Sequence, residues 1–265
     1  MFLFLQPQGR CRNSDRFVQA QGINTMTGQV LSLPKMPLHR TTGWVLILEG
    51  LLMFVPVAIL GRAINWPQSL SEPAAVVLPL LTQKAAEVRL GYFIYLVYSI
   101  LFWLVALLTV RVVSNGESES IWLRLATGFG IASTIARCLG IIRWLVAMPA
   151  LAMLYMNPAT SPQTREAIAV VYRVLNDYAG AIGEVLGVSL FAAIWLAIVS
   201  LTILRTNVLP NWIGFLGLFS ATLLFVQLAE LFGIDLGAFI SVSVGFLQLW
   251  FLLTGIAILL RPNRI

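Results

Sequence analysis

Five ionisable side chains lie inside long apolar stretches of this sequence, where their types could do chemistry. They are Glu49, Arg137, Arg143, Glu184 and Glu230. An ionisable group in the core of a bilayer costs at least about 2.5 to 3.5 kcal/mol, so each needs a partner or a water-filled cavity. Arginine keeps its charge and binds carboxylates through two parallel hydrogen bonds. We therefore expect Arg/Glu pairs between helices.

The depth of these groups predicts which of them pair. Counting inward at about 1.5 Å per residue places Glu184 and Glu230 near the outer boundary, Arg143 in the outer half, Arg137 near the midplane and Glu49 in the inner half. Arg143 is then expected to meet Glu184 or Glu230, and Arg137 to meet Glu49. The two arginines are separated by about 240° of helical rotation, so we expect them to face different neighbours.

Three interpretations of this buried polar site follow. We interpret the charges as a structural network that fixes the order of the helices. The first alternative is a carrier for protons or a small anion, with Arg137 or Arg143 as the charge anchor and Glu184 or Glu230 titrating. The second alternative is an accessory subunit that packs against a protein partner in a larger membrane complex.

Several enzyme classes are excluded by missing residues. The single histidine, His39, precedes the first apolar run, which removes a zinc motif of the H-E-x-x-H type and a bis-histidine haem. No lysine follows Lys84, so no late helix can form a retinal-type Schiff base. Paired aspartates within an apolar run and glycine-rich phosphate loops are absent as well. We expect no enzymatic activity, no cofactor and no metal.

The composition indicates the elements that must position these residues. Of 265 residues, 59% are hydrophobic and 11% charged, which is too apolar for an ordinary water-soluble domain. The apolar runs do not alternate, which favours helices over a barrel. We predict an all-α, polytopic membrane helix bundle in a lipid bilayer. The net charge of +6 comes mostly from Lys and Arg at the ends of apolar runs, so we expect no nucleic-acid partner.

Six apolar runs are long enough to cross a membrane as helices. They cover residues 43–61, 91–113, 122–155, 179–204, 212–233 and 236–260. The third run could form two short spans, giving seven, but its middle offers no Pro, Asn or Gly pair for a turn. One long or tilted helix is simpler. We expect residues 1–40 to be a polar, disordered arm without a cleaved leader, and residues 41–262 to form the transmembrane domain.

The distribution of Lys and Arg predicts the orientation. With six spans, ten of these residues lie on the side of the termini and five on the other side. Without the three in the distant N-terminal arm, the comparison is seven against five. The positive-inside rule then places both termini in the cytoplasm, and we expect the plasma membrane as the location.

Local signals predict helix starts, kinks and contacts. Ser161 can cap a helix with Pro162 at its first position, and Ser71 can cap one ahead of Glu72. Prolines 56 and 149 are expected to kink the first and third spans. Two stripes of small residues permit close helix packing and, if they face each other, carry Glu184 toward the arginines. The stripes are Gly128, Ala132, Ala136 and Gly140 on the third span, and Ala179, Gly183 and Gly187 on the fourth.

Five stretches resemble a group of bacterial six-span membrane proteins known as family 4386 of the domains of unknown function. They are NWPQSLSEPAAVVLPLLT (65–82), LGYFIYLVYS (90–99), LGIIRWLVAMPALA (139–152), GEVLG (183–187) and LPNWIGFLG (209–217). The resemblance implies a six-helix membrane domain and carries over no activity and no catalytic residue. Arg143, Trp144 and Glu184 fall inside the matching stretches, which makes them the first targets for mutation.

Overall fold

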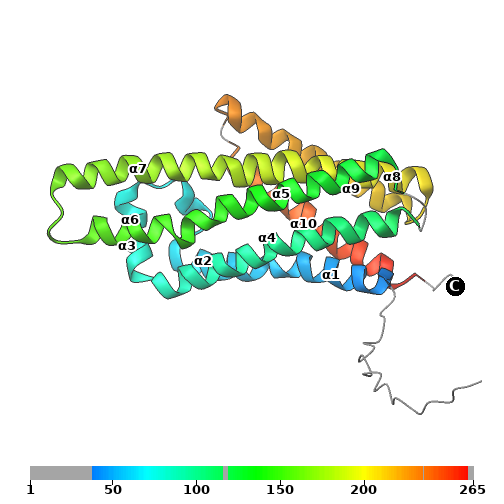
Figure 1. Ribbon diagram of the computed structural model, residues 1–265, viewed down its shortest axis with the longest axis horizontal. Coiled ribbons are helices and arrows are strands. Elements are labelled where there is room, and N and C mark those ends of the chain that lie inside the picture. The colour runs from blue at the N-terminus through cyan, green and yellow to red at the C-terminus, as the bar shows by residue number, and fades with distance from the viewer. Residues whose placement is uncertain (1–37, 116–118, 235, 262–265) are drawn as a thin grey trace, which may run out of the picture. The chain divides into compact units, whose positions relative to one another are not determined.

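The computed structural model describes residues 38–115, 119–234 and 236–261, and over these residues all regular secondary structure is helical (Figure 1). The sequence predicts an N-terminal arm over residues 1–40, and residues 1–37 of it lie outside the described residues. The elements are α1 (Leu38–Leu52), α2 (Phe54–Ile64), η1 (Gln68–Ser71), α3 (Ala74–Gln83), α4 (Ala85–Val113), α5 (Ile121–Leu145), α6 (Ala147–Met156), α7 (Pro162–Gly180), η2 (Ala181–Ala192), α8 (Ala193–Thr206), α9 (Asn211–Val226), η3 (Gln227–Phe232) and α10 (Ala238–Leu259).

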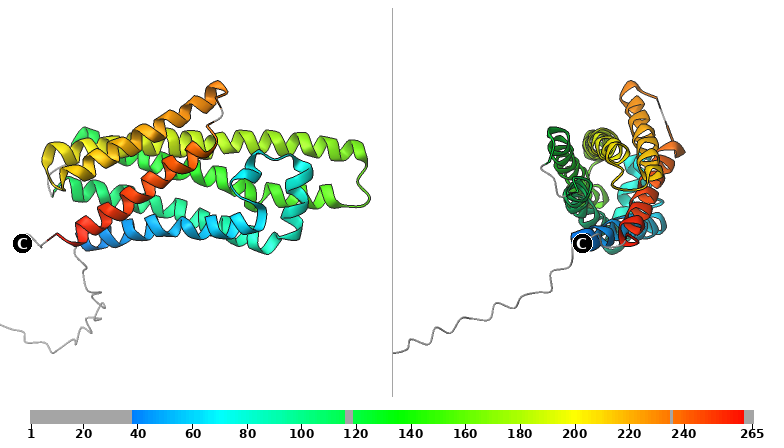
Figure 2. Two further views of the ribbon diagram at one scale, coloured as in Figure 1. Left: turned by 180° about the vertical axis from the view of Figure 1, so that it is seen from behind. Right: turned by 90° about the vertical axis from the view of Figure 1, so that its right-hand side faces the viewer.

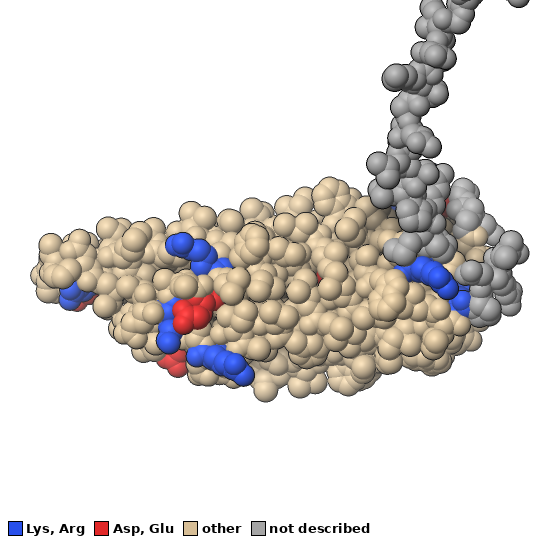
Figure 3. Space-filling view, turned by 90° about the horizontal axis from the view of Figure 1, so that it is seen from below, with Lys and Arg blue, Asp and Glu red and all other residues tan. Residues whose placement is uncertain are grey.

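Six helical segments are long and apolar enough to cross a membrane, which confirms the prediction of an all-α bundle with six spans. They are Leu38–Ile64, Ala85–Val113, Ile121–Met156, Pro162–Thr206, Asn211–Phe232 and Ala238–Leu259. Half or less of the most apolar window of each segment is buried inside the protein, so much apolar surface is left for lipid. Figure 3 shows a broad belt of the surface with almost no charged side chain between two charged zones.

Two prolines interrupt the first and third spans, as predicted. The break between α1 and α2 is at Met53, and the break between α5 and α6 is at Val146. A proline lacks an N–H, and its ring clashes with the carbonyl four residues earlier. For Pro56 and Pro149 those carbonyls belong to the last residues of α1 and α5. The third run nevertheless remains one segment of 36 residues, so the seven-span alternative is wrong.

The first and last spans pack along one another in the six-helix body. At Gly43 of α1, an added Cβ would lie 2.6 Å from the Leu259 side chain and 3.0 Å from the carbonyl oxygen of Gly255 in α10. The start of α1 and the end of α10 therefore lie at the same end of the body (Figure 1). This arrangement follows from an even number of spans.

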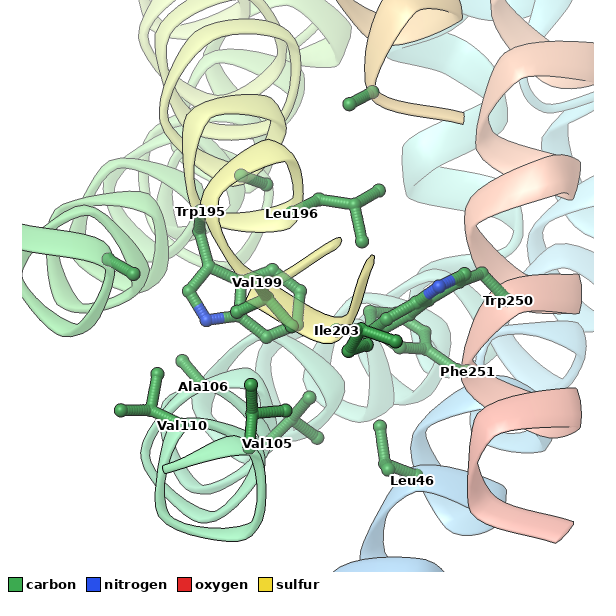
Figure 4. Packing of buried hydrophobic residues seen from close by; sticks show 14 of the residues in the cluster. Leu46, Val105, Ala106, Val110, Trp195, Leu196, Val199, Ile203, Trp250 and Phe251 are labelled. Atoms are coloured by element: carbon green, nitrogen blue, oxygen red, sulfur yellow. The ribbon is translucent and has the colours of Figure 1, made fainter. Parts of the chain in front are cut away.

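Two apolar clusters hold the helices together. The larger one packs Trp195 of α8 edge-on against Trp250 of α10, with ring centroids 5.7 Å apart, and includes Leu46 of α1 (Figure 4). The smaller one joins α2, α3, α6 and α7 to Tyr92 of α4 and Trp144 of α5. Figure 2 shows α3 and α6 beside each other at the end of the body away from the last turn of α10. Trp144 of the smaller cluster lies beside the buried Arg143.

The helix-start predictions have two outcomes. Ser161 caps α7 as expected, because its hydroxyl accepts the N–H of Thr164 at 3.2 Å and Pro162 occupies the first turn. The Ser71 prediction is wrong. Ser71 ends the short helix η1, and α3 begins at Ala74 after an extended Pro73 without a side-chain cap.

Candidate functional site

The fourth span contains a long π-helical segment. Helices α7, η2 and α8 follow one another without a break, and η2 is π-helical over the 12 residues Ala181–Ala192. π-helical geometry is rare and occurs frequently at functional sites. The Ser189 hydroxyl donates to the Glu184 carbonyl, five residues earlier, at 3.1 Å, and the Ser133 hydroxyl of α5 donates to the Gly187 carbonyl at 2.7 Å. Side chains thus supplement the backbone bonding of this segment.

The two small-residue stripes bring α5 and η2 into backbone contact. A Cβ added to Gly140 would lie 2.7 Å from Gly183 Cα and 3.0 Å from the Ala179 carbonyl oxygen. A Cβ added to Gly187 would lie 3.4 Å from the Cβ of Ala136. The predicted facing of the stripes is confirmed over these residues. Gly128 is the exception: among the described residues, no atom of a neighbouring element lies within 4 Å of its added Cβ.

Arg143 is held beside this contact. Its Nη1 donates to the carbonyl of Gly140 at 2.7 Å, and its guanidinium carbon lies 5.5 Å from the ring of Trp144. Trp144 in turn stacks on Tyr92 of α4, with centroids 4.9 Å apart and an interplanar angle of 4°. The Nε of Arg143 and the hydroxyl of Tyr92 are buried without a hydrogen-bond partner among the described residues.

Arg137 lies against aromatic rings of α4. Its guanidinium carbon is 4.6 Å from the ring centroid of Tyr98 and 5.0 Å from that of Phe102. A cation over an aromatic face is attracted by the ring quadrupole, with about 2 kcal/mol available when the pair is desolvated. The Arg137 atoms Nε and Nη1 have no hydrogen-bond partner within the described part of the chain. The rings therefore stabilise the charge and leave N–H groups available.

Both arginines line one small cavity. Its volume is about 20 Å³, which is room for about one water molecule. The lining comes from the turn after α2 and from α4, α5, η1 and η2, and consists of Trp66, Leu70, Tyr92, Tyr95, Arg137, Gly140, Ile141, Arg143, Trp144, Gly183 and Glu184. The expected rotation gives the arginines different nearest neighbours, as predicted, but their long side chains reach the same cavity.

The expected direct Arg/Glu ion pairs do not form. Ion pairs within 4 Å among the described residues are Lys84–Glu87, Arg111–Glu119 and Arg173–Asp177, and each includes an exposed side chain. Arg143 and Glu184 interact electrostatically at a longer distance, and Glu230 lies close enough to act on Glu184. The structure thus brings Arg143 near Glu184, as expected, but with the cavity at their meeting point.

Glu49 of α1 lies next to Gly50, which packs against Gln248 of α10. Its side chain is fully buried, and both carboxylate oxygens lack a hydrogen-bond donor among the described residues. Its charge and that of Arg137 interact, as the sequence predicted, but beyond 4 Å. Gln248 of α10 donates from Nε2 to the hydroxyl of Tyr98 at 2.7 Å, while its Oε1 has no partner among the same residues.

Sequence reasoning missed the tyrosines, and although it predicted an interhelical hydrogen bond from Gln248, it did not identify Tyr98 as the partner. Tyr92, Tyr95 and Tyr98 lie in an apolar run, and Gln248 is 150 residues from its partner Tyr98. The repeat of tyrosine at every third position of α4 is the signal that could have marked this helix face. For metals, the described residues contain no group of three or more His, Cys, Asp or Glu side chains that could hold an ion.

Residues 41–259 match the family described as "Domain of unknown function (DUF4386)". No curated protein and no solved structure matches the chain.

Proposed function

The chain belongs to the family Domain of unknown function (DUF4386), and from that premise we propose that it is a membrane carrier that binds a small anion in the cavity between α4, α5 and η2. One observation carries the proposal. Two arginines line the same cavity, and Nε of each arginine, together with Nη1 of Arg137, lacks a hydrogen-bond partner among the described residues. Buried charges without a partner are costly, and a bound anion would remove that cost.

The donors and the size of the cavity indicate the class of ligand. The Nε atoms of Arg137 and Arg143 and the hydroxyl of Tyr92 are free donors, whereas Glu184 is the one carboxylate in the lining. Donors in excess of acceptors favour an anion. A volume of about 20 Å³ fits a particle of about the size of water. A halide ion satisfies both requirements.

The interpretation of the buried charges as a purely structural network is weakened, because it relied on direct Arg/Glu ion pairs. Such a network stabilises the fold when arginine and carboxylate meet directly and satisfy each other's hydrogen bonds. Arg143 instead spends one N–H on the Gly140 carbonyl and interacts with Glu184 only beyond 4 Å. The π-helical segment supports a functional site as well, because regular α-helix would suffice for packing alone.

The proposal includes the setting of the protein. We place it in the plasma membrane with both termini in the cytoplasm, supported by the excess of Lys and Arg on the side of the termini. The cavity then lies in the outer half of the bundle, where Tyr92 and Trp144 of the smaller cluster line it. Because the site offers binding groups and none of the catalytic motifs considered, we propose transport without enzymatic activity.

Halide binding to the purified protein in lipid nanodiscs tests the proposal. We expect chloride or fluoride to bind, and Arg143→Gln to weaken binding about 10- to 100-fold, because a hydrogen bond to a charged group contributes about 1.5 to 3 kcal/mol. Arg124→Gln is the matched control, since Arg124 is an exposed arginine of the same helix and lies outside the cavity lining. Arg143→Lys should restore part of the affinity because it keeps the charge.

Flux into proteoliposomes is the second measurement. Halide uptake down a gradient should be lost in Arg143→Gln and retained in Arg124→Gln. A folded Arg143→Gln variant that binds and transports halide like the natural protein contradicts the proposal. A structural network predicts a different result, in which Arg143→Gln loses stability and Arg143→Gln with Glu184→Gln regains it. An accessory subunit would be unstable when purified without its partner.

A further inference from the structure

We infer that Glu49 is a proton-binding site coupled to the anion cavity through Arg137, so that the protein takes up a proton together with the anion. This inference rests on the proposed function and adds the coupling to it. The observation behind it is a juxtaposition: Arg137 lines the cavity, and its guanidinium carbon also lies 4.6 Å from the ring of Tyr98, whose hydroxyl accepts a hydrogen bond from Gln248 of α10. A Cβ added at Gly50, next to Glu49 in α1, would lie 3.2 Å from the carbonyl oxygen of that same Gln248.

The surroundings of Glu49 disfavour a permanent negative charge. The side chain is fully buried in α1, and neither carboxylate oxygen has a hydrogen-bond donor among the described residues. An ionised carboxylate in such a place is expensive unless a cation compensates it. A protonated carboxyl group needs an acceptor instead, and Gln248 Oε1 of the helix packed on α1 is a buried acceptor without a partner in the described part of the chain.

The charged and titratable groups that act on Glu49 are few. Arg137 of α5 favours the carboxylate, and among the described residues Tyr98 of α4 is the other ionisable group whose charge interacts with it. Helix α10, which packs most extensively on α1, carries no ionisable side chain between Ala238 and Leu259. The protonation of Glu49 therefore depends mainly on how much of the Arg137 charge is available to it.

An anion in the cavity competes with Glu49 for that charge. A bound halide and an ionised Glu49 are both stabilised by Arg137, and they repel each other. Halide binding therefore favours the protonated form of Glu49, and by linkage a proton on Glu49 strengthens halide binding by the same factor. The proton bound by Glu49 comes from solvent, so anion and proton are taken up together without a change in net charge.

Halide affinity measured as a function of pH tests the coupling. In the natural protein, chloride affinity should fall as pH rises through the titration of Glu49, by a factor in the usual range of about 5 to 150 for coupled sites. Glu49→Gln mimics the protonated form, so its affinity should stay at the low-pH value across that interval. Glu184→Gln is the matched control, because it removes a carboxylate that lines the cavity itself. In this variant the fall in chloride affinity with rising pH that comes from Glu49 should remain.

A second measurement needs no anion and separates the two proposals. Infrared spectroscopy reports the carbonyl stretch of a protonated carboxyl group, and Glu49→Gln identifies the band of Glu49. In Arg137→Gln this band should persist to higher pH than in the natural protein, because the compensating cation is gone. An identical titration in both proteins overturns the coupling. Chloride binding with the same pH profile in Glu49→Gln also overturns it, whereas an absence of chloride binding alone refutes the proposed function.

Discussion

Replacing Gly140 by alanine tests how closely α5 and η2 must approach to form the cavity. The new Cβ would lie 2.7 Å from Gly183 Cα and 3.0 Å from the Ala179 carbonyl oxygen. Ordinary carbon contacts are about 3.5 to 4.0 Å, so the two backbones must separate by about 1 Å. Because both neighbouring atoms are main chain, no side chain can rotate away to make room.

The matched control for Gly140→Ala is Gly128→Ala, on the same helix. No atom of a neighbouring element lies within 4 Å of a Cβ at Gly128 in the described structure. Both changes gain the same helix propensity, about 0.8 to 1.0 kcal/mol. Overpacking costs about 1 to 3 kcal/mol and applies at Gly140 alone. We therefore expect Gly140→Ala to be less stable than Gly128→Ala by about 1 to 3 kcal/mol.

Reversible unfolding in mixed detergent micelles gives the free energy of unfolding of each variant. We also expect Gly140→Ala to weaken halide binding, since the displaced η2 widens the cavity and its lining no longer surrounds the anion. Equal stabilities of the two variants would refute the close approach of α5 and η2. Unchanged halide binding in a destabilised Gly140→Ala would show that this approach does not shape the site.

Two further predictions concern the contact between Tyr98 and Gln248 and the orientation. Tyr98→Phe leaves the buried Gln248 amide without its acceptor, which should lower the free energy of unfolding by about 1 to 3 kcal/mol. Tyr178→Phe is the control, because that side chain is 69% exposed and its hydroxyl should contribute nothing measurable. Equal effects of the two changes would contradict the contact between Tyr98 and Gln248. A membrane-impermeant maleimide should label Asn157→Cys in intact cells, because this residue lies in the turn between α6 and α7 on the proposed outer side. The same reagent should label Asn207→Cys, between α8 and α9, only after permeabilisation. The opposite pattern would reverse the proposed orientation.

The features that the sequence predicted are those with local causes. The spans follow from apolar length, the two breaks from Pro56 and Pro149, and the start of α7 from Ser161. Facing of the stripes at Gly140 and Gly183 follows from the spacing of small residues. The Ser71 prediction is wrong because Glu72 and Pro73 are both extended, which leaves Ser71 at the end of η1, with two residues between it and the start of α3.

The rest of the site depends on contacts that sequence spacing does not encode. Residues of η2 have ordinary helix-forming types, so nothing local separates its π-helical form from an α-helix. The depth of the residues in the sequence predicted that Arg143 lies near Glu184. It did not predict whether the two side chains touch or both line a cavity. Trp195 and Trp250 lie far apart in the sequence, yet both are buried and pack edge-on against each other in the core.

The position of a bound halide is the most direct test of the anion site. In crystals soaked with bromide, anomalous diffraction should show a peak in the cavity within hydrogen-bond distance of a guanidinium nitrogen of Arg137 or Arg143. The peak should disappear in Arg143→Gln and remain in Arg124→Gln. A cavity without bromide, with the Glu184 carboxylate bound directly to Arg143, would contradict the proposed function.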